Sequence, residues 1–521
     1  MRLEEVFKGC AYEISGESKK QSGDEGQYLE TEVSGIAYDS RKVVKDTVFV
    51  AIRGEKLDGH DFINDAVRRG AVAIIHEKRE QDAPLYSDIG EPLFIKVRDS
   101  RRALACISNN FFERPSEFVS VIGVTGTNGK TTTTYLLKSI LEAWGRNTGL
   151  IGTITYSIGD RHYPAVRTTP EALEFQGLLR EMVKAGCSHV VTEVSSHALS
   201  QCRVDYTRFG AGVFTNLTRD HLDFHGTMEE YYRAKRRLFT ELLTAEGTAV
   251  INRDDPWGRR LLADLREQGK ELEHGHSIIT YGTEQGSDVT ALDPENTLSG
   301  LSFTLGYRGA TCRIYCPLVG VPNIYNILAA ASVGLALGIS FEVISEGIRN
   351  TPPVEGRIEK VEAGQDFLCI VDYAHTPDAL ERLIVAAREI LKDRNLSGRI
   401  ITLFGCGGER DRGKRPLMGE IASRLSDYLL LTSDNPRNED PDEILSEIVS
   451  GISGKRYEVI PDRREAITRA IEKAGPGDIV LIAGKGHEDY QEIKGVRYLF
   501  RDKEVADEAI KKRIVKSNRE Q

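Results

Sequence analysis

The chain has 521 residues, of which 40% are hydrophobic and 28% are charged, and its formal net charge is −10. One hydrophobic core rarely organises so long a chain, so we expect about three domains. The acidic excess, with no basic stripe to offset it, argues against a nucleic-acid-binding protein. The longest apolar stretch, residues 327–339, has the length of a buried core helix and is too short to span a bilayer.

The start of the chain and its cysteines indicate the compartment. The first ten residues, MRLEEVFKGC, carry early acidic side chains and no apolar core segment, so we do not expect them to form a signal peptide. The eight cysteines are scattered, and the one close pair, Cys312 and Cys316, has neither metal-site nor redox-motif spacing. We expect reduced, mostly buried cysteines in a cytoplasmic enzyme. We also expect a monomer without membrane insertion.

The predicted elements follow an α/β pattern. The region before about residue 117 has no nucleotide-binding loop, holds a polar insert near residues 15–26, and is expected to form a separate small domain. Further on, short β-branched runs recur, each followed by a helix-like pattern, which predicts largely parallel sheets with ligands at the carboxyl ends of the strands. The expected strands are residues 118–124, 189–192, 212–215, 248–251, 367–371, 400–404, 429–432 and 478–482.

A second domain boundary is expected at the run Asn350-Thr351-Pro352-Pro353, where two prolines end a helix. A new series of strands and helices begins after it. The predicted domains are therefore residues 1–117, 118–353 and 354–521.

A glycine-rich run, Gly126-Thr127-Asn128-Gly129-Lys130-Thr131-Thr132, separates the first of these strands from a predicted helix at residues 132–144. A strand, a glycine-rich turn and a helix together direct backbone N–H groups at a triphosphate. Lys130 would neutralise the β/γ oxygens, and the Thr131 hydroxyl would bind Mg²⁺. The strict phosphate-loop pattern has a glycine where this chain has Val124, so the match is imperfect. The run predicts an ATP-using enzyme.

Two polar side chains, Glu193 and His221, each come just after a predicted strand in the same half of the chain. A carboxylate and an imidazole at such positions could hold Mg²⁺ between ATP and a second substrate. Each residue alone is more often an ordinary polar group of a loop. Lys235, within a run of basic residues, looks by itself like part of a solvated helix face.

In the C-terminal third, four strands in succession end in clusters of Gly, Arg, Asp and His. One glycine cluster would simply be a turn, but four together favour a ligand site. The clusters are Asp372-Tyr373-Ala374-His375, residues 405–415, Asp434-Asn435-Pro436-Arg437 and residues 484–488.

The chain resembles the Mur ligases over essentially its whole length. The motifs that carry the resemblance are, in this order, Gly126–Thr132, Glu193–His197, Asn216–Asp223, Asn323–Asn326 and Asp434–Arg437. The resemblance implies three domains: a small N-terminal α/β domain, a central P-loop ATPase-like domain with a parallel sheet, and a C-terminal Rossmann-like α/β domain. They would bind the uridine end of a nucleotide-sugar, ATP, and an amino acid, respectively. The polar insert fits no motif of this family.

The resemblance also implies roles for single residues. The catalytic and metal-binding set would be Lys130, Thr131, Glu193, His221 and Lys235. ATP would contact residues 126–132, Asn326, Arg357 and Asp372. The UDP-muramoyl-dipeptide would contact Ser40, Thr168, Thr169, Ser195, Gln201 and Arg203. Diaminopimelate would contact Arg410, Asp434, Asn435, Pro436, Arg437, Gly484 and Glu488.

Lys235 matches the lysine that such enzymes carry as a carbamate, N6-carboxylysine. The carbamate turns an ammonium that would repel Mg²⁺ into a carboxylate that binds it. Its formation needs a deprotonated amine, so Lys235 is expected in a desolvated site that lowers its pKa.

The implied reaction adds meso-2,6-diaminopimelate to the D-glutamyl γ-carboxylate of UDP-N-acetylmuramoyl-L-alanyl-D-glutamate in peptidoglycan precursor synthesis. ATP would convert the carboxylate into an acyl phosphate, which the incoming amine then attacks. Catalysis would be chiefly positioning and charge neutralisation in a dry site, which suggests that the third domain closes over the second. In this family the Asp-Asn-Pro-Arg form goes with diaminopimelate, because Arg437 can fork onto its second carboxylate.

Three alternatives remain. A lysine-adding muramoyl ligase is disfavoured by Arg437, and a folylpolyglutamate synthase by the first domain and by the Asp-Asn-Pro-Arg run. A partner-coupled NTPase, from a different functional class, would leave Lys235 and the third-domain loops without a role.

Overall fold

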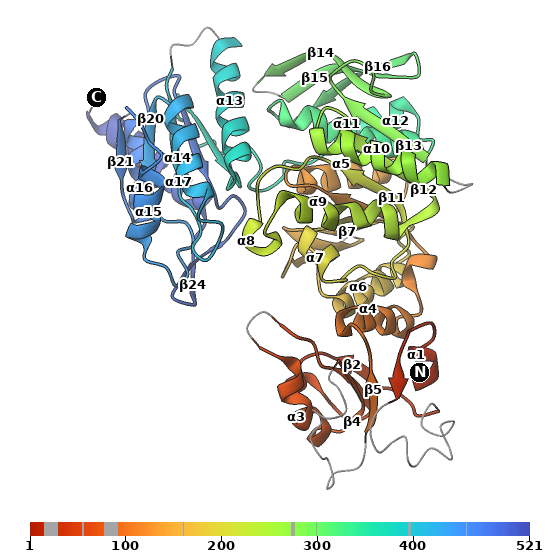
Figure 1. Cartoon of the computed structure of the whole chain (residues 1–521). Coiled ribbons are helices and arrows are strands. Elements are labelled where there is room, and N and C mark those ends of the chain that lie inside the picture. Colours follow the sequence, from red (N-terminus) through yellow and green to blue (C-terminus); the bar gives the residue numbers. More distant parts are fainter. Residues whose placement is uncertain are drawn as a thin grey trace. The chain divides into compact units, whose positions relative to one another are not determined.

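The computed structural model describes residues 1–14, 30–54, 57–77, 92–159, 161–271, 277–297, 300–393, 398–454 and 456–520. The polar insert near residues 15–26 lies outside the described residues. The chain divides into two compact units: residues 1–123, 146–212 and 234–247 form the first, and residues 124–145, 213–233 and 248–521 form the second. Both combine helices with sheets rich in parallel strands (Figure 1), which confirms the expected α/β class.

The first unit begins with a five-stranded sheet of order β1-β5-β4-β3-β2, in which only the edge strand β1 is antiparallel. Successive side chains of its strands point to opposite faces. Val48 and Ile75 therefore pack with α1 and α4, whereas Phe49 and Ile74 pack with α3. The elements are α1 (Leu3–Val6), β1 (Glu13–Ile14), β2 (Gly35–Ala37), β3 (Thr47–Val50), α3 (Ile63–Arg68), β4 (Ala71–His76), β5 (Leu93–Lys96) and α4 (Ser100–Phe111).

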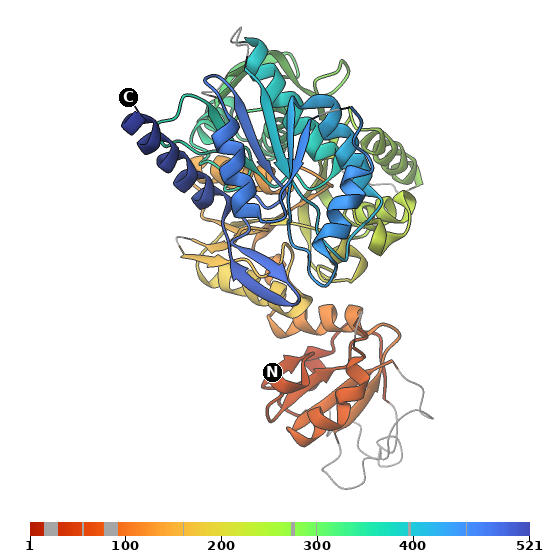
Figure 2. The same cartoon turned by 90° about the vertical axis from the view of Figure 1, so that its left-hand side faces the viewer.

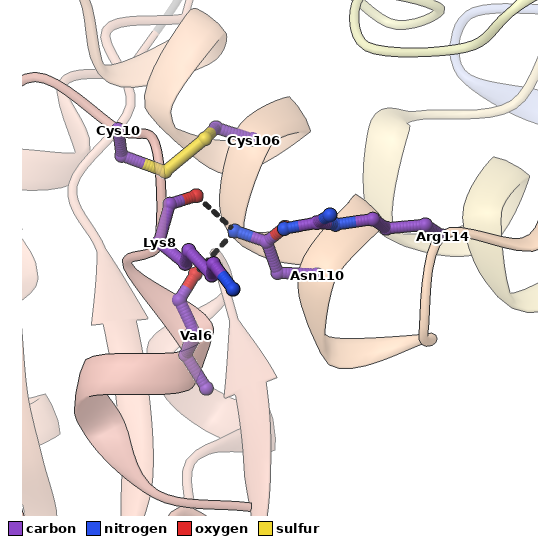
Figure 3. Close-up of a disulfide and its surroundings, with 6 residues drawn as sticks. All are labelled: Val6, Lys8, Cys10, Cys106, Asn110 and Arg114. Atoms are coloured by element: carbon purple, nitrogen blue, oxygen red, sulfur yellow. Dashed lines mark hydrogen bonds between the residues drawn. A yellow bond between two sulfur atoms is a disulfide. The ribbon is translucent and has the colours of Figure 1, made fainter.

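A disulfide joins Cys10, after α1, to Cys106 in α4. Beside it, the Asn110 amide donates hydrogen bonds to the carbonyls of Val6 and Lys8, at 2.9 and 2.8 Å (Figure 3). The expectation that all eight cysteines are reduced is therefore wrong for this pair, which is separated by 96 residues and has no recognisable spacing motif. The other six cysteines are free, and all but Cys312 are buried.

The rest of the first unit carries predicted substrate loops. Strand β10 pairs in parallel with β7, and β8 and β9 extend this group in antiparallel fashion. The elements are β7 (Thr148–Ile151), β8 (Thr155–Ile158), β9 (Arg161–Pro164), α6 (Ala172–Lys184), β10 (His189–Glu193) and α7 (Ser196–Ser200).

Several elements belong partly to each unit, because the division of the chain passes through them. The predicted strand and helix on either side of the glycine-rich run are confirmed as β6 and α5. The divided elements are β6 (Ser120–Thr125), β11 (Phe209–Phe214), α9 (Met228–Arg237) and β12 (Leu243–Asn252). Between them in the chain, α5 (Lys130–Ala143) and α8 (Leu222–His225) lie in the second unit, and a π-helical turn (Leu238–Leu242) lies in the first.

In the second unit, β12 and β13 are parallel, but β14, β15 and β16 form an antiparallel meander. The expectation of largely parallel sheets is wrong for this part. The apolar stretch at 327–339 lies mostly in the buried helix α11, and α12 ends at Arg349, before the two prolines, as expected. The elements are α10 (Pro256–Glu271), β13 (Ser277–Gly282), β14 (Val289–Thr297), β15 (Gly300–Tyr307), β16 (Ala310–Cys316), α11 (Pro322–Ala336) and α12 (Phe341–Arg349).

The C-terminal sheet has the order β17-β18-β22-β19-β20-β21, and its five strands after β17 are parallel. Helices cover both of its faces: α13, α14 and α15 pack on one, α16 and α17 on the other. The elements are β17 (Glu359–Lys360), β18 (Leu368–Asp372), α13 (Pro377–Asp393), β19 (Ile400–Phe404), α14 (Lys414–Leu425), β20 (Tyr428–Leu431), α15 (Pro441–Val449), β21 (Tyr457–Val459), α16 (Arg463–Lys473), β22 (Ile479–Ala483) and α17 (Asp502–Glu520).

Two further features complete this part. A separate antiparallel hairpin, β23 (Tyr490–Ile493) and β24 (Val496–Leu499), projects from it as the blue two-stranded ribbon in Figure 2. Arg463 at the start of α16 forms a fully buried ion pair with Asp502 of α17, at 2.7 Å. Within the described ranges, no helix combines the length and apolarity needed to cross a membrane.

Candidate active site

The glycine-rich run follows the buried strand β6 and leads directly into α5. Gly126 has a φ of +146°, and a Cβ atom there would lie 1.9 Å from the Thr215 hydroxyl. Gly129 has a φ of +87°, and a Cβ atom there would lie 2.3 Å from Oδ1 of Asn326. Both positions therefore require glycine, for backbone conformation and for space.

The same run is held by the segment that follows β11. The backbone N–H of Asn128 donates to Oδ1 of Asn216 at 3.0 Å, and its carbonyl accepts from the Thr215 hydroxyl at 2.6 Å. The Lys130 ammonium curls back over the turn and donates to the carbonyls of Gly126 and Thr127, at 2.9 and 2.8 Å. Two motifs about 90 residues apart in sequence thus form one structure.

Residues of the C-terminal segment also reach this loop. The Asn128 amide donates to the Asp378 carboxylate at 2.8 Å, and the Arg357 guanidinium donates to the Thr131 hydroxyl at 3.1 Å. Asp372 accepts hydrogen bonds from the backbone N–H groups of Ile358 and Ala374. Asp372 therefore fixes the turn that carries Arg357. Asn326, predicted near adenine, lies against Gly129.

A cluster around the buried carboxylate of Asp220 lies next to the predicted metal ligand His221. The Asp220 oxygens lie 3.3 Å from Nε2 of His221 and 3.8 Å from Nε2 of His375. Burial would raise the Asp220 pKa, but the protonated forms of His221 and His375 and the Lys414 ammonium bring it well below its usual range. Burial, reinforced by Lys414, lowers the pKa of His375 to about 4, so this ring is neutral at pH 7. His375 thus docks on Asp220 as a neutral ring.

In the first unit, the predicted ligand Glu193 is fully buried at the end of β10. Its carboxylate accepts hydrogen bonds from the backbone N–H and the hydroxyl of Thr153, at 2.8 and 3.0 Å. The Thr153 hydroxyl in turn accepts from the Thr168 hydroxyl, 3.1 Å away. Sequence reasoning missed Thr153, although it follows the buried strand β7 closely, as site residues of such sheets do.

The residues predicted to bind the muramoyl-dipeptide lie close to Glu193. The Thr169 hydroxyl donates to the Glu193 carbonyl at 2.8 Å and accepts from the Ser195 N–H at 3.1 Å. Arg203 donates to the Thr169 carbonyl at 3.1 Å and to the Gln201 side chain at 2.6 Å. The structure therefore gathers Thr168, Thr169, Glu193, Ser195, Gln201 and Arg203. Ser40 begins a short 3₁₀ helix (Ser40–Lys42) after β2 in the same unit.

Lys235 lies in α9, and its side chain is only 1% exposed. The interpretation of its run as a solvated basic face is therefore wrong at this position, although Arg233 is exposed. Two residues further along α9, Arg237 donates to both carboxylate oxygens of Asp205, at 3.1 and 3.0 Å. This pair ties the end of α9 to the segment that contains Asp205. Burial is the environment that carbamate formation on Lys235 requires.

Three of the four proposed magnesium ligands, all except His221, match the ion in chemistry. Glu193 and a carbamate on Lys235 would supply carboxylate oxygens, and Thr131 a hydroxyl oxygen, which are the donors that Mg²⁺ prefers. Among the described residues, no three His, Cys, Asp or Glu side chains gather closely enough to hold a metal ion. This search does not cover the full proposed set of magnesium ligands, because two of its four members, Thr131 and Lys235, are not His, Cys, Asp or Glu.

The predicted amino-acid loops meet at the end of the C-terminal sheet. The Asn435 amide donates to Glu488 at 2.8 Å, and a Cβ atom on Gly484 would lie 2.6 Å from the Asp434 carboxylate. The Arg437 guanidinium donates to the carbonyl of Gly408, and a Cβ atom on Gly407 would lie between Arg437 and Arg410, at 3.1 and 3.7 Å. Sequence reasoning assigned no role to Lys485, which is fully buried among these loops.

Comparison with known proteins gives the family. The Mur ligase family, catalytic domain matches residues 32–112, the Mur ligase middle domain matches residues 124–334, and the Mur ligase, glutamate ligase domain matches residues 356–486. The chain belongs to the Mur ligase family. The resemblance inferred from the motifs, and the expected ligase class, are thereby confirmed.

Relatives within the Mur ligases match nearly the whole chain. A protein of Solibacter usitatus named UDP-N-acetylmuramoyl-L-alanyl-D-glutamate–2,6-diaminopimelate ligase is 46% identical over 491 residues, covering 93% of this chain and 95% of the relative. A Clostridium acetobutylicum protein of the same name is 42% identical, covering 98% and 99%. A solved structure with this name in its title is 33% identical, with a TM-score of 0.67 and 99% coverage of both chains.

The folylpolyglutamate synthase of Mycobacterium tuberculosis, solved with ADP and AMPPCP, is a more distant neighbour. It is 17% identical with a TM-score of 0.61, and covers 74% of this chain and 92% of its own. This likeness shows a shared fold alone.

Proposed function

We propose that this protein is the ATP-dependent ligase that adds meso-2,6-diaminopimelate to UDP-N-acetylmuramoyl-L-alanyl-D-glutamate in peptidoglycan precursor synthesis. The observation that carries the proposal is the meeting of the Asp434–Arg437 loop with Glu488. Arg437 offers a guanidinium and Glu488 a carboxylate, which complement the carboxylate and ammonium at the distal end of diaminopimelate. Relatives with this activity in their names are 42 to 46% identical.

We assign the substrates to three domains, residues 1–117, 118–353 and 354–521. The first would hold the uridine end at Ser40, and the second would hold ATP on the glycine-rich loop. The remaining proposed ATP contacts are Asn326, Arg357 and Asp372. The muramoyl-dipeptide would lie on Thr168, Thr169, Ser195, Gln201 and Arg203. Diaminopimelate would contact Arg410, Asp434, Asn435, Pro436, Arg437, Gly484 and Glu488.

The reaction needs a carboxylate to approach a triphosphate of the same charge sign. Lys130 offsets this repulsion, and Mg²⁺, when held by Thr131, Glu193, His221 and carbamylated Lys235, supplies further positive charge. The D-glutamyl γ-carboxylate then attacks the γ-phosphorus of ATP, and ADP leaves. The amine of diaminopimelate attacks the resulting acyl phosphate, loses a proton and expels phosphate. Arg357, bonded to Thr131, is suited to the phosphate oxygens of ATP.

The proposed place of action is the cytoplasm, and the proposed state is a monomer, because one polypeptide carries all the proposed substrate contacts. The decisive experiment measures phosphate release by the purified chain with ATP, Mg²⁺ and the UDP-muramoyl-dipeptide. Release is expected only when diaminopimelate is added. Release that depends on lysine would favour the lysine-adding alternative, and release that needs neither amino acid would favour a partner-coupled NTPase.

A further inference from the structure

The side chain of Lys485, in the turn after β22, is fully buried. Its ammonium donates to Oδ1 of Asn435 at 3.1 Å and to Oε2 of Glu488 at 2.9 Å. Burial of a charged group is costly unless the group is paired and hydrogen-bonded. The buried Lys485 ammonium therefore depends on these two hydrogen bonds. Both partners, Asn435 and Glu488, are proposed contacts of diaminopimelate.

Glu488 is held on one side only. Its Oε2 atom accepts from Lys485 and also from the Asn435 amide, at 2.8 Å. Both bonds end on the same oxygen, which leaves Oε1 as the atom that can meet a substrate ammonium. A carboxylate with one anchored oxygen has a fixed orientation, so its second oxygen is already aimed when substrate arrives.

Asn435 is oriented by the same network. Its Oδ1 atom accepts from Lys485 and from the backbone N–H of Glu492, at 2.9 Å, while its amide nitrogen donates to Glu488. Two donors on the oxygen and an acceptor on the nitrogen satisfy the amide in a single orientation. Loss of the Lys485 ammonium would remove one bond from each of the two side chains.

The hairpin β23–β24 holds the backbone of the same loop. The Gln491 side chain donates to the carbonyl of Asp434 at 2.8 Å. The Arg437 N–H donates to the Glu492 carbonyl at 3.1 Å, and the Lys494 N–H donates to the Arg437 carbonyl at 2.7 Å. These bonds fix the backbone of the loop. The orientation of the Asn435 side chain then depends on the network around Lys485.

Electrostatics points in the same direction. Burial and the neighbouring charge of Asp434 raise the pKa of Glu488, and Lys485 opposes this rise. A neutral Glu488 would lose its attraction for an ammonium. The Lys485 charge thus favours the ionised carboxylate that a cationic substrate group needs.

We propose that Lys485 is a positioning residue of the diaminopimelate site, where it orients Glu488 and Asn435 so that Glu488 receives the distal ammonium of the substrate. The proposal rests on the proposed function. It makes Lys485 a determinant of amino-acid affinity that need not touch the amino acid.

The test compares steady-state kinetics of the wild-type protein with those of Lys485→Met, Glu488→Gln and the double variant. For K485M we expect the KM for diaminopimelate to rise about tenfold or more, as for loss of a charge-assisted bond, and the KM for ATP to stay within about twofold. The effects of K485M and E488Q should add to clearly less than their sum in the double variant, because Lys485 acts largely through Glu488. Lys512→Met, an exposed lysine of α17, is the matched control and should behave as wild type.

Two results would overturn the proposal: a K485M variant with an unchanged KM for diaminopimelate, or one in which the KM values of all three substrates rise together. Should K485M fail to fold by circular dichroism, Lys485→Arg carries the test. It keeps the charge, but the longer, planar guanidinium cannot replace a fully buried ammonium without displacing Asn435 or Glu488. The KM for diaminopimelate alone should therefore rise a few-fold, and an unchanged value again refutes the idea. Failure of the proposed function is distinct, since it appears in the wild-type protein as phosphate release independent of diaminopimelate.

Discussion

Arg357 and Thr131, 226 residues apart in sequence, are joined by a hydrogen bond of 3.1 Å from the guanidinium to the hydroxyl. The guanidinium also lies over the ring of Tyr373, 4.7 Å from its centroid. Thr131 is the second residue of α5, which follows the glycine-rich turn, so Arg357 lies where the phosphates of ATP are expected. An arginine already held at this position needs little rearrangement to bind an anion.

Arg357→Ala should therefore raise the KM for ATP by about ten- to hundredfold, as expected for loss of a charge-assisted contact with phosphate. The KM for diaminopimelate should stay close to that of the wild type. Initial rates of phosphate release, measured while each substrate is varied in turn, give both constants. Arg349→Ala, at the exposed end of α12, serves as control. Equal effects on both substrates would contradict a role at the ATP site.

Lys235→Ala should reduce turnover about a hundredfold or more, because the proposed magnesium site would lose an anionic ligand. Removal of CO₂ from a solution of the wild-type protein should lower its turnover rate, and added bicarbonate should restore that rate. Carbon-13 NMR of protein supplied with labelled bicarbonate would detect the carbamate directly. Lys184→Ala, an exposed lysine at the end of α6, should have no effect. A wild-type rate that is indifferent to CO₂, with no carbamate signal, would disprove the modification.

Arg437→Lys should raise the KM for diaminopimelate about a hundredfold and leave the KM for ATP unchanged. A lysine keeps the charge but cannot form two parallel bonds with a carboxylate. The exposed Arg464→Lys substitution is the matched control. If the R437K variant retains wild-type diaminopimelate kinetics, Arg437 does not belong to the site.

The protein should lose stability when the pH falls below about 6.5, in part through His487. Burial lowers the pKa of this histidine from 6.5 to about 3, and its Nδ1 atom has no hydrogen-bond partner among the described residues. Between these pH values the unfolded chain takes up a proton that the folded chain does not, so the free energy of unfolding falls as the pH falls. From pH 6.5 to pH 5 the loss should be about 1 to 2 kcal/mol.

His487→Phe keeps an aromatic ring beside Tyr373, whose centroid lies 5.0 Å away, and removes the titrating group. The variant should therefore show a smaller difference between its thermal midpoints at pH 7.5 and pH 5 than the wild type. Circular dichroism at the two pH values measures this difference. An identical pH dependence in both proteins would remove His487 from the explanation.

The Cys10–Cys106 disulfide should stabilise the first unit. It closes a loop of 96 residues, for which the chain-entropy account gives about 4 to 5 kcal/mol. A reductant should therefore lower the urea midpoint of the wild-type protein and leave a Cys10→Ser, Cys106→Ser double variant unaffected. In denaturant without reductant, thiol titration should count six thiols, rising to eight after reduction. A count of eight before reduction would show that the bond does not form.

The sequence predicted the four inner strands of the C-terminal sheet and missed its short edge strands, β17 and β21. The expected strand at residues 400–404 coincides with β19, because its side chains are apolar on both faces and both faces are covered by helices. The meander β14–β16 was not predicted. An alternating signal existed at Leu301, Phe303 and Leu305, which are buried, but it was not used.

The candidate site was predictable where a motif is local, as in the glycine-rich run. Contacts between distant segments were not, since the pairing of Arg219 with Asp411 joins residues 192 positions apart. Lys485 was missed because a lysine between glycines usually lies at the surface. Only the fold reveals that it is buried against Glu488.

The buried ion pair of Arg463 with Asp502 connects α17 to the turns that precede Asp434 and Gly484. Arg463 also donates to the carbonyls of Ser433 and Ala483, the residues directly before Asp434 and Gly484. Shortening the chain before Asp502 would strand a guanidinium in the interior, an error that typically costs about 3 to 5 kcal/mol. The two turns that begin at Asp434 and Gly484, which carry the proposed diaminopimelate contacts, would be disturbed first. A truncated protein should therefore lose selectivity for the amino acid before it loses affinity for ATP.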